Sequence, residues 1–138
     1  MWPADCNGNI GFPSDVAGFV LAGGRSKRMG TDKGLLEFGG QPMVKYALDA
    51  LTPLGGQPIL LGATREYAQF GYPILQDIHP GLGPLGGIYT ALKHMNCQIA
   101  VFTTCDSPWV SAAVCEYLLA MLGTGPAAIP VCDGRAYP

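Results

Sequence analysis

The apolar residues of the chain occur in short runs, and most runs are followed by residues that favour turns. Two six-residue runs, Val16–Leu21 and Ile99–Thr104, are almost entirely apolar, which is typical of strands buried on both faces of a sheet. Shorter runs at residues 59–61 and 73–75 predict two further strands, and residues 127–131 predict a last one.

Between these runs, apolar residues recur every three or four positions and predict three amphipathic helices. The first begins at Pro42, the second begins at Pro84, and the third follows Ser111 as its N-cap and ends at Gly123. The residues expected to face the core are Val44, Ala47, Leu48 and Leu51 in the first helix, Leu85, Ile88, Tyr89, Leu92 and Met95 in the second, and Val114, Leu118, Met121 and Leu122 in the third.

Strands and helices therefore alternate along the chain. This order predicts an α/β fold with three layers, in which an open, mostly parallel sheet carries helices on both faces. Residues 16–138 are expected to form this domain, whereas residues 1–15 have no apolar period and are expected to be an N-terminal arm. Because an open sheet would normally continue after the last predicted strand, we expect the domain to be C-terminally incomplete.

The composition fits one folded domain and excludes other classes of protein. The chain has 138 residues, of which 49% are hydrophobic and only 13% are charged, so it is too apolar to be disordered. No continuous apolar run reaches the roughly 20 residues of a membrane span. The net charge of −2 provides no broad cationic surface, so we expect binding neither to nucleic acid nor to a membrane.

The cysteines and the N-terminus indicate a cellular compartment. Five cysteines without a C-x-x-C pair do not suit structural zinc, and their odd number argues against a disulfide framework. The N-terminus has neither the positive start nor the apolar stretch of a signal peptide. We therefore expect reduced thiols in a cytoplasmic protein.

The positive charge is concentrated in a glycine-rich segment that follows the first predicted strand. Four of the eight Lys and Arg residues lie between positions 25 and 33, and glycines occupy positions 23, 24, 30 and 34. Glycine lets the backbone bend sharply and leaves N–H groups accessible, so this segment is suited to bind several phosphates. A solvated basic loop is the simpler alternative. The spacing excludes a Walker P-loop, which requires G-x-x-x-x-G-K-[ST].

A carboxylate follows the other long apolar strand. Asp106 lies in the sequence Thr104-Cys105-Asp106-Ser107-Pro108, directly after that strand. Ligands of open α/β sheets bind at the carboxyl ends of the strands, so Asp106 is expected at the same edge as the basic segment. Mg²⁺ is typically held there by one or two carboxylates together with phosphate oxygens and water. Ordinary turn formation by Asp before Ser-Pro is the alternative.

Two other patterns point away from dinucleotide binding and from general-base chemistry. Residues 81–86 match G-x-G-x-x-G, but residues 76–80 separate these glycines from the preceding strand, whereas the dinucleotide motif begins at the strand end. His79 and His94 are isolated in the sequence, so no general base is obvious. Transfer of a nucleotidyl group to an ionised phosphate needs none, because positioning and charge neutralisation are sufficient.

Residues 21–36 resemble a long family signature, L-A-G-G-x-S-x-R-M-G-x-D-K-x-L-L, of molybdenum cofactor guanylyltransferase. Shorter stretches similar to the same family follow in the same order, and they are Gln76-Asp77, residues 83–87, residues 105–108 and Asp133-Gly134-Arg135. The resemblance runs from about Val16 to the last residue. It implies a Rossmann-like form of the α/β fold and membership of the nucleotidyltransferases.

The resemblance also implies a reaction and a set of site residues. GMP would be transferred from GTP to molybdopterin carrying molybdenum, with release of pyrophosphate and with Mg²⁺ as cofactor. The residues implied to bind the nucleotide are Leu21, Ala22, Gly23, Gly24, Lys33, Asp77 and Asp106. The residues implied to be catalytic are Arg28, Lys33 and Asp106, with Asp106 as the metal ligand. Other cofactor-synthesis proteins and molybdoenzyme chaperones are the implied protein partners.

Other functions remain open at this stage. Cytidylyltransferases of the same fold usually have Ala where this chain has Gly23, so the resemblance implies a purine nucleotide, GTP, rather than CTP. A cytidylyltransferase, another nucleotidyltransferase of the fold and a truncated, non-catalytic GTP-binding module are the alternatives to a guanylyltransferase.

Overall fold

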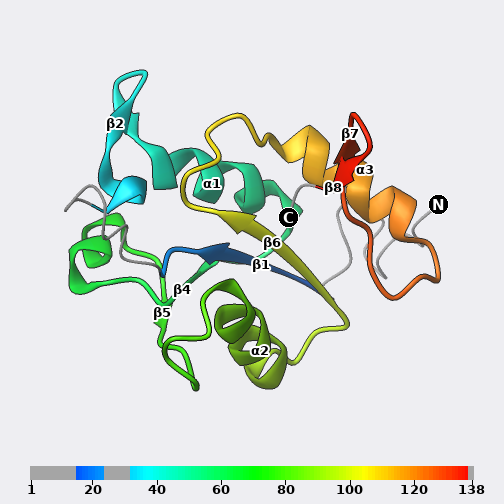
Figure 1. Ribbon diagram of the computed structural model, residues 1–138, viewed down its shortest axis with the longest axis horizontal. Helices are drawn as coiled ribbons and strands as arrows, with labels where there is room; N and C mark the ends of the chain where they lie inside the picture. Colours follow the sequence, from blue (N-terminus) through cyan, green and yellow to red (C-terminus); the bar gives the residue numbers. More distant parts are fainter. Residues whose placement is uncertain (1–14, 24–31, 137–138) are drawn as a thin grey trace.

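A sheet of four parallel strands lies at the centre of the molecule (Figure 1), in the order β5, β4, β1, β6. The computed structural model describes residues 15–23 and 32–136. The strands are β1 (Val16–Leu21), β4 (Ile59–Leu61), β5 (Ile74–Leu75) and β6 (Ile99–Thr104). These four predicted strands are confirmed, except that β5 does not include Pro73.

The strand β1 lies inside the sheet because both of its faces are apolar. Phe19 and Val20 point to opposite faces and are 1% and 0% exposed. On one face, Phe19 stacks on Phe102 of β6, with ring centroids 5.4 Å apart. On the other face, Gly18 leaves room for Leu51, whose Cβ would be only 3.0 Å from a Cβ added at position 18. Each face of β1 therefore contributes to a separate apolar core.

Helices cover both faces of the sheet, so the predicted three-layer α/β fold is confirmed (Figure 1). α1 (Met43–Leu51) packs on one face with α3 (Ala112–Leu122) beside it, and α2 (Pro84–His94) packs on the opposite face. The structure begins α2 at the predicted Pro84 and gives α3 the predicted N-cap, Ser111. None of the described helices is long and apolar enough to cross a membrane.

Shorter elements connect these layers. The 3-10 helices are η1 (Lys33–Leu35), η2 (Thr52–Leu54) and η3 (Arg65–Phe70). Two antiparallel hairpins lie outside the central sheet, and they are β2 (Glu37–Phe38) with β3 (Gln41–Pro42), and β7 (Val131–Cys132) with β8 (Arg135–Ala136). In Figure 1, η1 and η3 lie on the same side of the molecule as the carboxyl end of β1.

The strand predicted at residues 127–131 is wrong. Only Val131 of that segment belongs to a strand, and it pairs with Ala136 in the β7–β8 hairpin rather than with the central sheet. Ile129 and Val131 are 57% and 65% exposed, so this apolar run does not face a core of the described residues. Pro130 also has no N–H group to donate to a neighbouring strand.

The predicted core-facing residues are right for α1 and wrong for most of α2. Val44, Ala47, Leu48 and Leu51 of α1 are all buried. In α2, by contrast, Leu85, Tyr89 and Leu92 are exposed, and the residues buried against the sheet are Gly86, Gly87, Thr90 and Ala91. A Cβ at Gly87 would lie 2.7 Å from Leu21 Cδ2, so α2 packs close to the sheet through small residues.

In α3 the prediction is half right. Leu118 and Leu122 are partly buried, but Val114 and Met121 are exposed, and Cys115 and Leu119 take the buried positions. The helix is apolar on nearly all sides, so spacing alone did not determine which residues face α1.

Two substitutions test this assignment of helix faces, and they are Leu48→Ala in α1 and Leu85→Ala in α2. Leu48 is 0% exposed and Leu85 is 73% exposed. We expect Leu48→Ala to lower the free energy of unfolding by about 2–5 kcal/mol, because it leaves a cavity. We expect Leu85→Ala to change it by less than about 0.5 kcal/mol. Urea unfolding followed by circular dichroism measures both, and a loss above about 2 kcal/mol in Leu85→Ala would contradict the observed face of α2.

Candidate active site

The carboxyl ends of the four strands meet at one edge of the sheet, and backbone hydrogen bonds continue past the strands at this edge. These bonds run from Ala22 N to Leu61 O (3.0 Å), from Gly62 N to Leu75 O (2.8 Å) and from Cys105 N to Leu21 O (3.1 Å). The residues that follow β1, β4, β5 and β6 are therefore held in one row. This row, which we call the carboxyl edge, contains the predicted site residues Leu21, Ala22, Gly23, Asp77 and Asp106.

Two glycines let the ends of β1 and β4 approach each other closely. A Cβ at Gly23 would lie 3.3 Å from both the Cα and the carbonyl oxygen of Gly62. A Cβ at Gly62 would lie 3.1 Å from the Cα of Gly23, and Gly62 also has a φ of +65°, which favours glycine. Neither position can carry a side chain without moving the neighbouring strand end.

Asp77 follows β5, and its carboxylate lies against Gly62 and the first turn of α2. A Cβ at Gly62 would be 3.4 Å from both of its carboxylate oxygens, and a Cβ at Gly87 would be 3.7 Å from Oδ1. Asp77 Oδ1 is buried and has no hydrogen-bond partner among the described residues. The next residue is fixed, because Ile78 N donates to the buried Thr90 Oγ1 at 2.9 Å. A buried acceptor without a donor is costly, so Asp77 is suited to accept from a bound ligand.

Lys33 and Asp106 form an ion pair at the same edge, with Lys33 Nζ 3.6 Å from Asp106 Oδ2. Their side chains are 48% and 41% exposed, so both remain accessible to a ligand. The turn that presents Asp106 is held by a hydrogen bond of 2.6 Å between Thr104 Oγ1 and Ser107 Oγ. The predicted meeting of the basic segment and the carboxylate is thus observed for Lys33.

Two predicted site residues, Gly24 and Arg28, lie outside the described residues. The basic segment is described only from Asp32 onward, where η1 begins.

No sequence pattern predicted a role for Tyr67, which lies beneath the site, or for its neighbours Asp32 and Cys105. Tyr67 of η3 is fully buried, and its hydroxyl donates to Asp32 Oδ1 at 2.5 Å. Cys105 is partly buried beside them. Burial, together with the nearby carboxylates of Asp106 and Asp32, raises the pKa of the Cys105 thiol to about 11. The contact between Tyr67 and Asp32 joins positions 35 residues apart, so no local pattern could reveal it.

The chemistry of Asp106 fits a hard divalent cation such as Mg²⁺, because its carboxylate is accessible and carboxylate oxygens are the ligands that Mg²⁺ prefers. Within residues 15–23 and 32–136, no group of three or more His, Cys, Asp or Glu side chains forms a complete metal cage. This agrees with the way proteins bind Mg²⁺, through one or two carboxylates while substrate phosphates supply other ligands.

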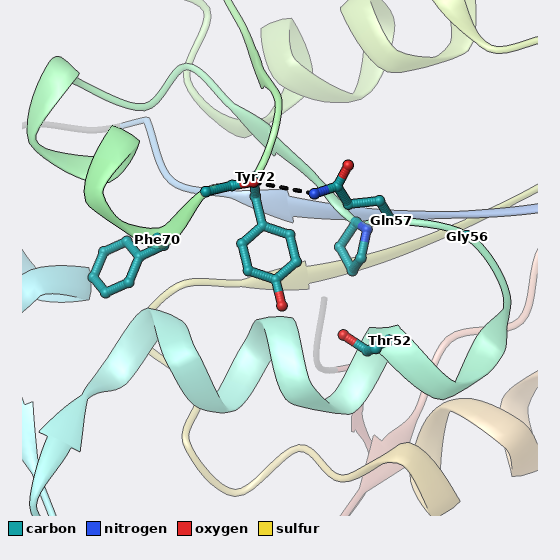
Figure 2. Close-up of a pocket in the computed structure, with 7 residues that line it drawn as sticks. Thr52, Gly56, Gln57, Phe70 and Tyr72 are labelled. Atoms are coloured by element: carbon teal, nitrogen blue, oxygen red, sulfur yellow. Dashed lines mark hydrogen bonds between the residues drawn. The ribbon is translucent and has the colours of Figure 1, made fainter.

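A groove of about 480 Å³ lies at the opposite edge of the sheet (Figure 2). It is lined by Thr52, Gly56, Gln57, Pro58, Phe70, Gly71 and Tyr72. Gln57 Nε2 donates to Gly71 O at 3.1 Å across it. Pro58 and Tyr72 precede β4 and β5, so this groove is at the amino ends of the strands. None of the predicted site residues that the structure describes lines it.

Comparison with known proteins adds sequence and structural relatives. Residues 18–138 match the MobA-like NTP transferase domain. The molybdenum cofactor guanylyltransferase of Shewanella loihica is 40% identical over 122 residues, which are 84% of this chain and 62% of that protein. Its counterpart in Polynucleobacter asymbioticus is 38% identical over 119 residues, with coverages of 83% and 59%.

Among solved structures, the molybdopterin-guanine dinucleotide biosynthesis protein A of Archaeoglobus fulgidus is 26% identical and superposes with a TM-score of 0.69. The superposition covers 88% of this chain and 64% of that one.

The parallel sheet and the glycine, lysine and aspartate residues at its carboxyl edge define a nucleotidyltransferase-type α/β domain of Rossmann-like fold. The chain belongs to the MobA-like NTP transferase domain family. Several of its relatives are molybdenum cofactor guanylyltransferases, so it is related to enzymes of molybdenum cofactor biosynthesis. The chain spans about three-fifths of the length of the curated relatives named above.

The close approach of β1 and β4 is tested by replacing Gly62 by Ala, with Gly71→Ala as the matched control. Both glycines have a positive φ (+65° and +74°), but a Cβ at Gly71 would meet nothing within 4 Å. We expect backbone strain of about 1–2 kcal/mol in both variants and a further loss of about 1–3 kcal/mol from overpacking in Gly62→Ala alone. Chemical denaturation measures the difference, and equal losses in the two variants would contradict the close approach.

The raised pKa of Cys105 predicts slow alkylation. At pH 8 a thiol with a pKa of about 11 is ionised in roughly one molecule in a thousand, and the thiolate is the reactive form. We expect iodoacetamide to modify Cys105 at least about tenfold more slowly than the exposed Cys132, and the Cys105 rate to rise with pH up to about 11. Peptide mass spectrometry measures each rate in the folded chain. Equal rates at pH 8 would contradict the prediction.

Proposed function

We propose that this chain binds GTP at the carboxyl edge and provides the nucleotidyl-transfer site of a molybdenum cofactor guanylyltransferase. In the proposed reaction, GMP is transferred from GTP to molybdopterin carrying molybdenum, and pyrophosphate is released. The observation that carries this proposal is the placement of glycine backbone, Asp77, Lys33 and Asp106 at one edge of a parallel sheet. We also propose that the protein works in the cytoplasm.

The chemistry requires no general base. An ionised phosphate oxygen of the acceptor attacks the α-phosphorus of GTP, and the new P–O bond forms as the bond to the β-phosphate oxygen breaks. The electron pair of the broken bond leaves with pyrophosphate. Lys33 would lie where it can neutralise this developing charge, as a mobile point charge accessible to solvent. Arg28 is proposed to grip two phosphate oxygens at once.

Three further contacts complete the proposed nucleotide site. The backbone of Leu21, Ala22, Gly23 and Gly24 would lie against the guanine and the ribose. Asp77 would accept hydrogen bonds from the nucleoside, which would give its buried Oδ1 a donor. Asp106 would hold Mg²⁺, and the bound ion would supply charge neutralisation at the α-phosphate.

The choice of GTP over CTP is supported by the guanylyltransferase relatives. The structure gives a reason for glycine at position 23 that does not depend on the nucleotide base. A methyl group there would meet the backbone of Gly62 at 3.3 Å, so glycine allows the two strand ends to approach each other. Because this packing reason holds for either nucleotide, a cytidylyltransferase is the second candidate. Competition between GTP and CTP for binding separates it from a guanylyltransferase.

Calorimetric titration of Mg·GTP and Mg·CTP into the chain tests the proposal, with Asp106→Asn as the test variant. Asp49→Asn is the matched control, because it removes the same charge from an exposed carboxylate that is paired with Lys45 on α1. We expect GTP to bind at least about tenfold more tightly than CTP, a difference of about 1.4 kcal/mol. We expect Asp106→Asn to remove most of the Mg²⁺-dependent part of the affinity and Asp49→Asn to leave it unchanged.

Three results would change the assignment. Tighter binding of CTP would favour the cytidylyltransferase. GTP binding without transfer to molybdopterin would favour a non-catalytic GTP-binding module. Equal Mg²⁺ dependence in Asp106→Asn and in the unsubstituted chain would refute Asp106 as the metal ligand.

A further inference from the structure

Tyr67 has a buried hydroxyl that the proposed chemistry does not use. Tyr67 lies in η3, is 0% exposed, and donates to Asp32 Oδ1 at 2.5 Å. Burial and this hydrogen bond raise the pKa of Tyr67, so the hydroxyl stays a donor at neutral pH. Hydrogen bonds from neutral donors to a carboxylate are short and strong, which makes this contact a firm attachment point for Asp32.

Asp32 in turn shapes the 3-10 helix that carries Lys33. The same oxygen, Oδ1, accepts from Gly34 N at 3.1 Å, and the carbonyl oxygen of Asp32 accepts from Leu35 N at 3.1 Å. Asp32 is thus the N-cap of η1, and Lys33 is the first residue of that helix. Lys33 Nζ then lies 3.6 Å from Asp106 Oδ2.

Close packing around Gly34 also fixes the position of η1. A Cβ at Gly34 would overlap the Tyr67 hydroxyl and would lie 2.9 Å from Cys105 Cβ. The backbone of η1 is therefore enclosed between η3 and the end of β6, which continues directly into Asp106. A continuous set of contacts links the Tyr67 hydroxyl, the cap of η1, Lys33 and Asp106.

We propose that Tyr67 is a positioning residue for the nucleoside triphosphate. Its hydroxyl fixes Asp32 and thereby holds the Lys33 ammonium beside Asp106, from where Lys33 reaches beyond the α-phosphate to the β- and γ-phosphates that leave as pyrophosphate. The inference rests on the proposed function and adds a residue that touches no substrate. It predicts a specific defect. Loss of the hydroxyl weakens the binding of a triphosphate and leaves the binding of a monophosphate nearly unchanged, since only the longer ligand reaches Lys33.

Replacing Tyr67 by Phe tests this proposal, with Tyr46→Phe as the matched control. Tyr46 also donates its hydroxyl, to Phe38 O at 2.7 Å, but its partner is the β2 backbone and not the cap of η1. In calorimetric titrations we expect Tyr67→Phe to weaken Mg·GTP at least about tenfold. The displaced Lys33 then loses its contact with the charged phosphates, and a hydrogen bond to a charged group is worth at least about that factor. The same variant should bind GMP within about twofold of the unsubstituted chain, and Tyr46→Phe should bind both ligands within about twofold.

A double-substitution cycle separates positioning from a general structural role. If Tyr67 acts through Lys33, then Tyr67→Phe has little further effect on GTP affinity once Lys33 is replaced by Met. If the two effects add, or if Tyr67→Phe weakens GMP as much as GTP, the proposed role is overturned. Should Tyr67→Phe not fold, Asp32→Ala removes the same link from a partly exposed position and is expected to show the same selective loss for GTP.

Failure of this inference is distinguishable from failure of the proposed function. An unsubstituted chain that is folded but binds no GTP would overturn the proposed function, and with it the role of Tyr67 in nucleotide binding. An unsubstituted chain that binds GTP, together with a Tyr67→Phe variant of equal GTP affinity, would overturn the role of Tyr67 alone.

Discussion

The parallel pairing of β1 with β4 on one side and with β6 on the other is the constraint on which the candidate site depends. In this register, Leu21 lies opposite Leu61 and opposite Thr104, so the strands end at the same edge. The register is strongly specified, because a slip of one residue would turn Phe19 and Val20, both buried, to the wrong faces of the sheet. The apolar cores on the two faces therefore fix, at a distance, which loops meet at the carboxyl edge.

Small residues bring the elements at this edge closer than ordinary packing would allow. Gly23 and Gly62 let two strand ends touch through their backbones, and Gly87 lets α2 approach β1 and β4. Asp77 lies where these approaches converge, and this explains how a carboxylate oxygen is buried without a donor among the described residues. Close packing of small residues and an unsatisfied acceptor are thus two results of one arrangement. It also leaves the large apolar residues of α2 on the outside of the helix.

Sequence patterns predicted the elements better than their faces and better than the contacts between distant segments. The long apolar strands and the proline-initiated start of α2 were predictable because their signals are local. The face of α2 was not, because it packs through Gly86 and Gly87, and a search for large apolar residues at helical spacing selects its opposite side. The carboxylate of Asp106 was predicted from its place after a strand and from a resemblance, and that of Asp77 from the resemblance alone. The link between Tyr67 and Asp32 depends on tertiary folding alone.

The proposed function requires that nucleotide binds at the carboxyl edge of the sheet and not in the groove at the opposite edge. Titration of isotopically labelled chain with Mg·GTP, followed residue by residue through its backbone amide resonances, tests this claim most directly. We expect the largest changes at Ala22, Gly62, Asp77 and Asp106. Changes concentrated at Gly56 and Gly71, which line the groove at the opposite edge, would contradict it.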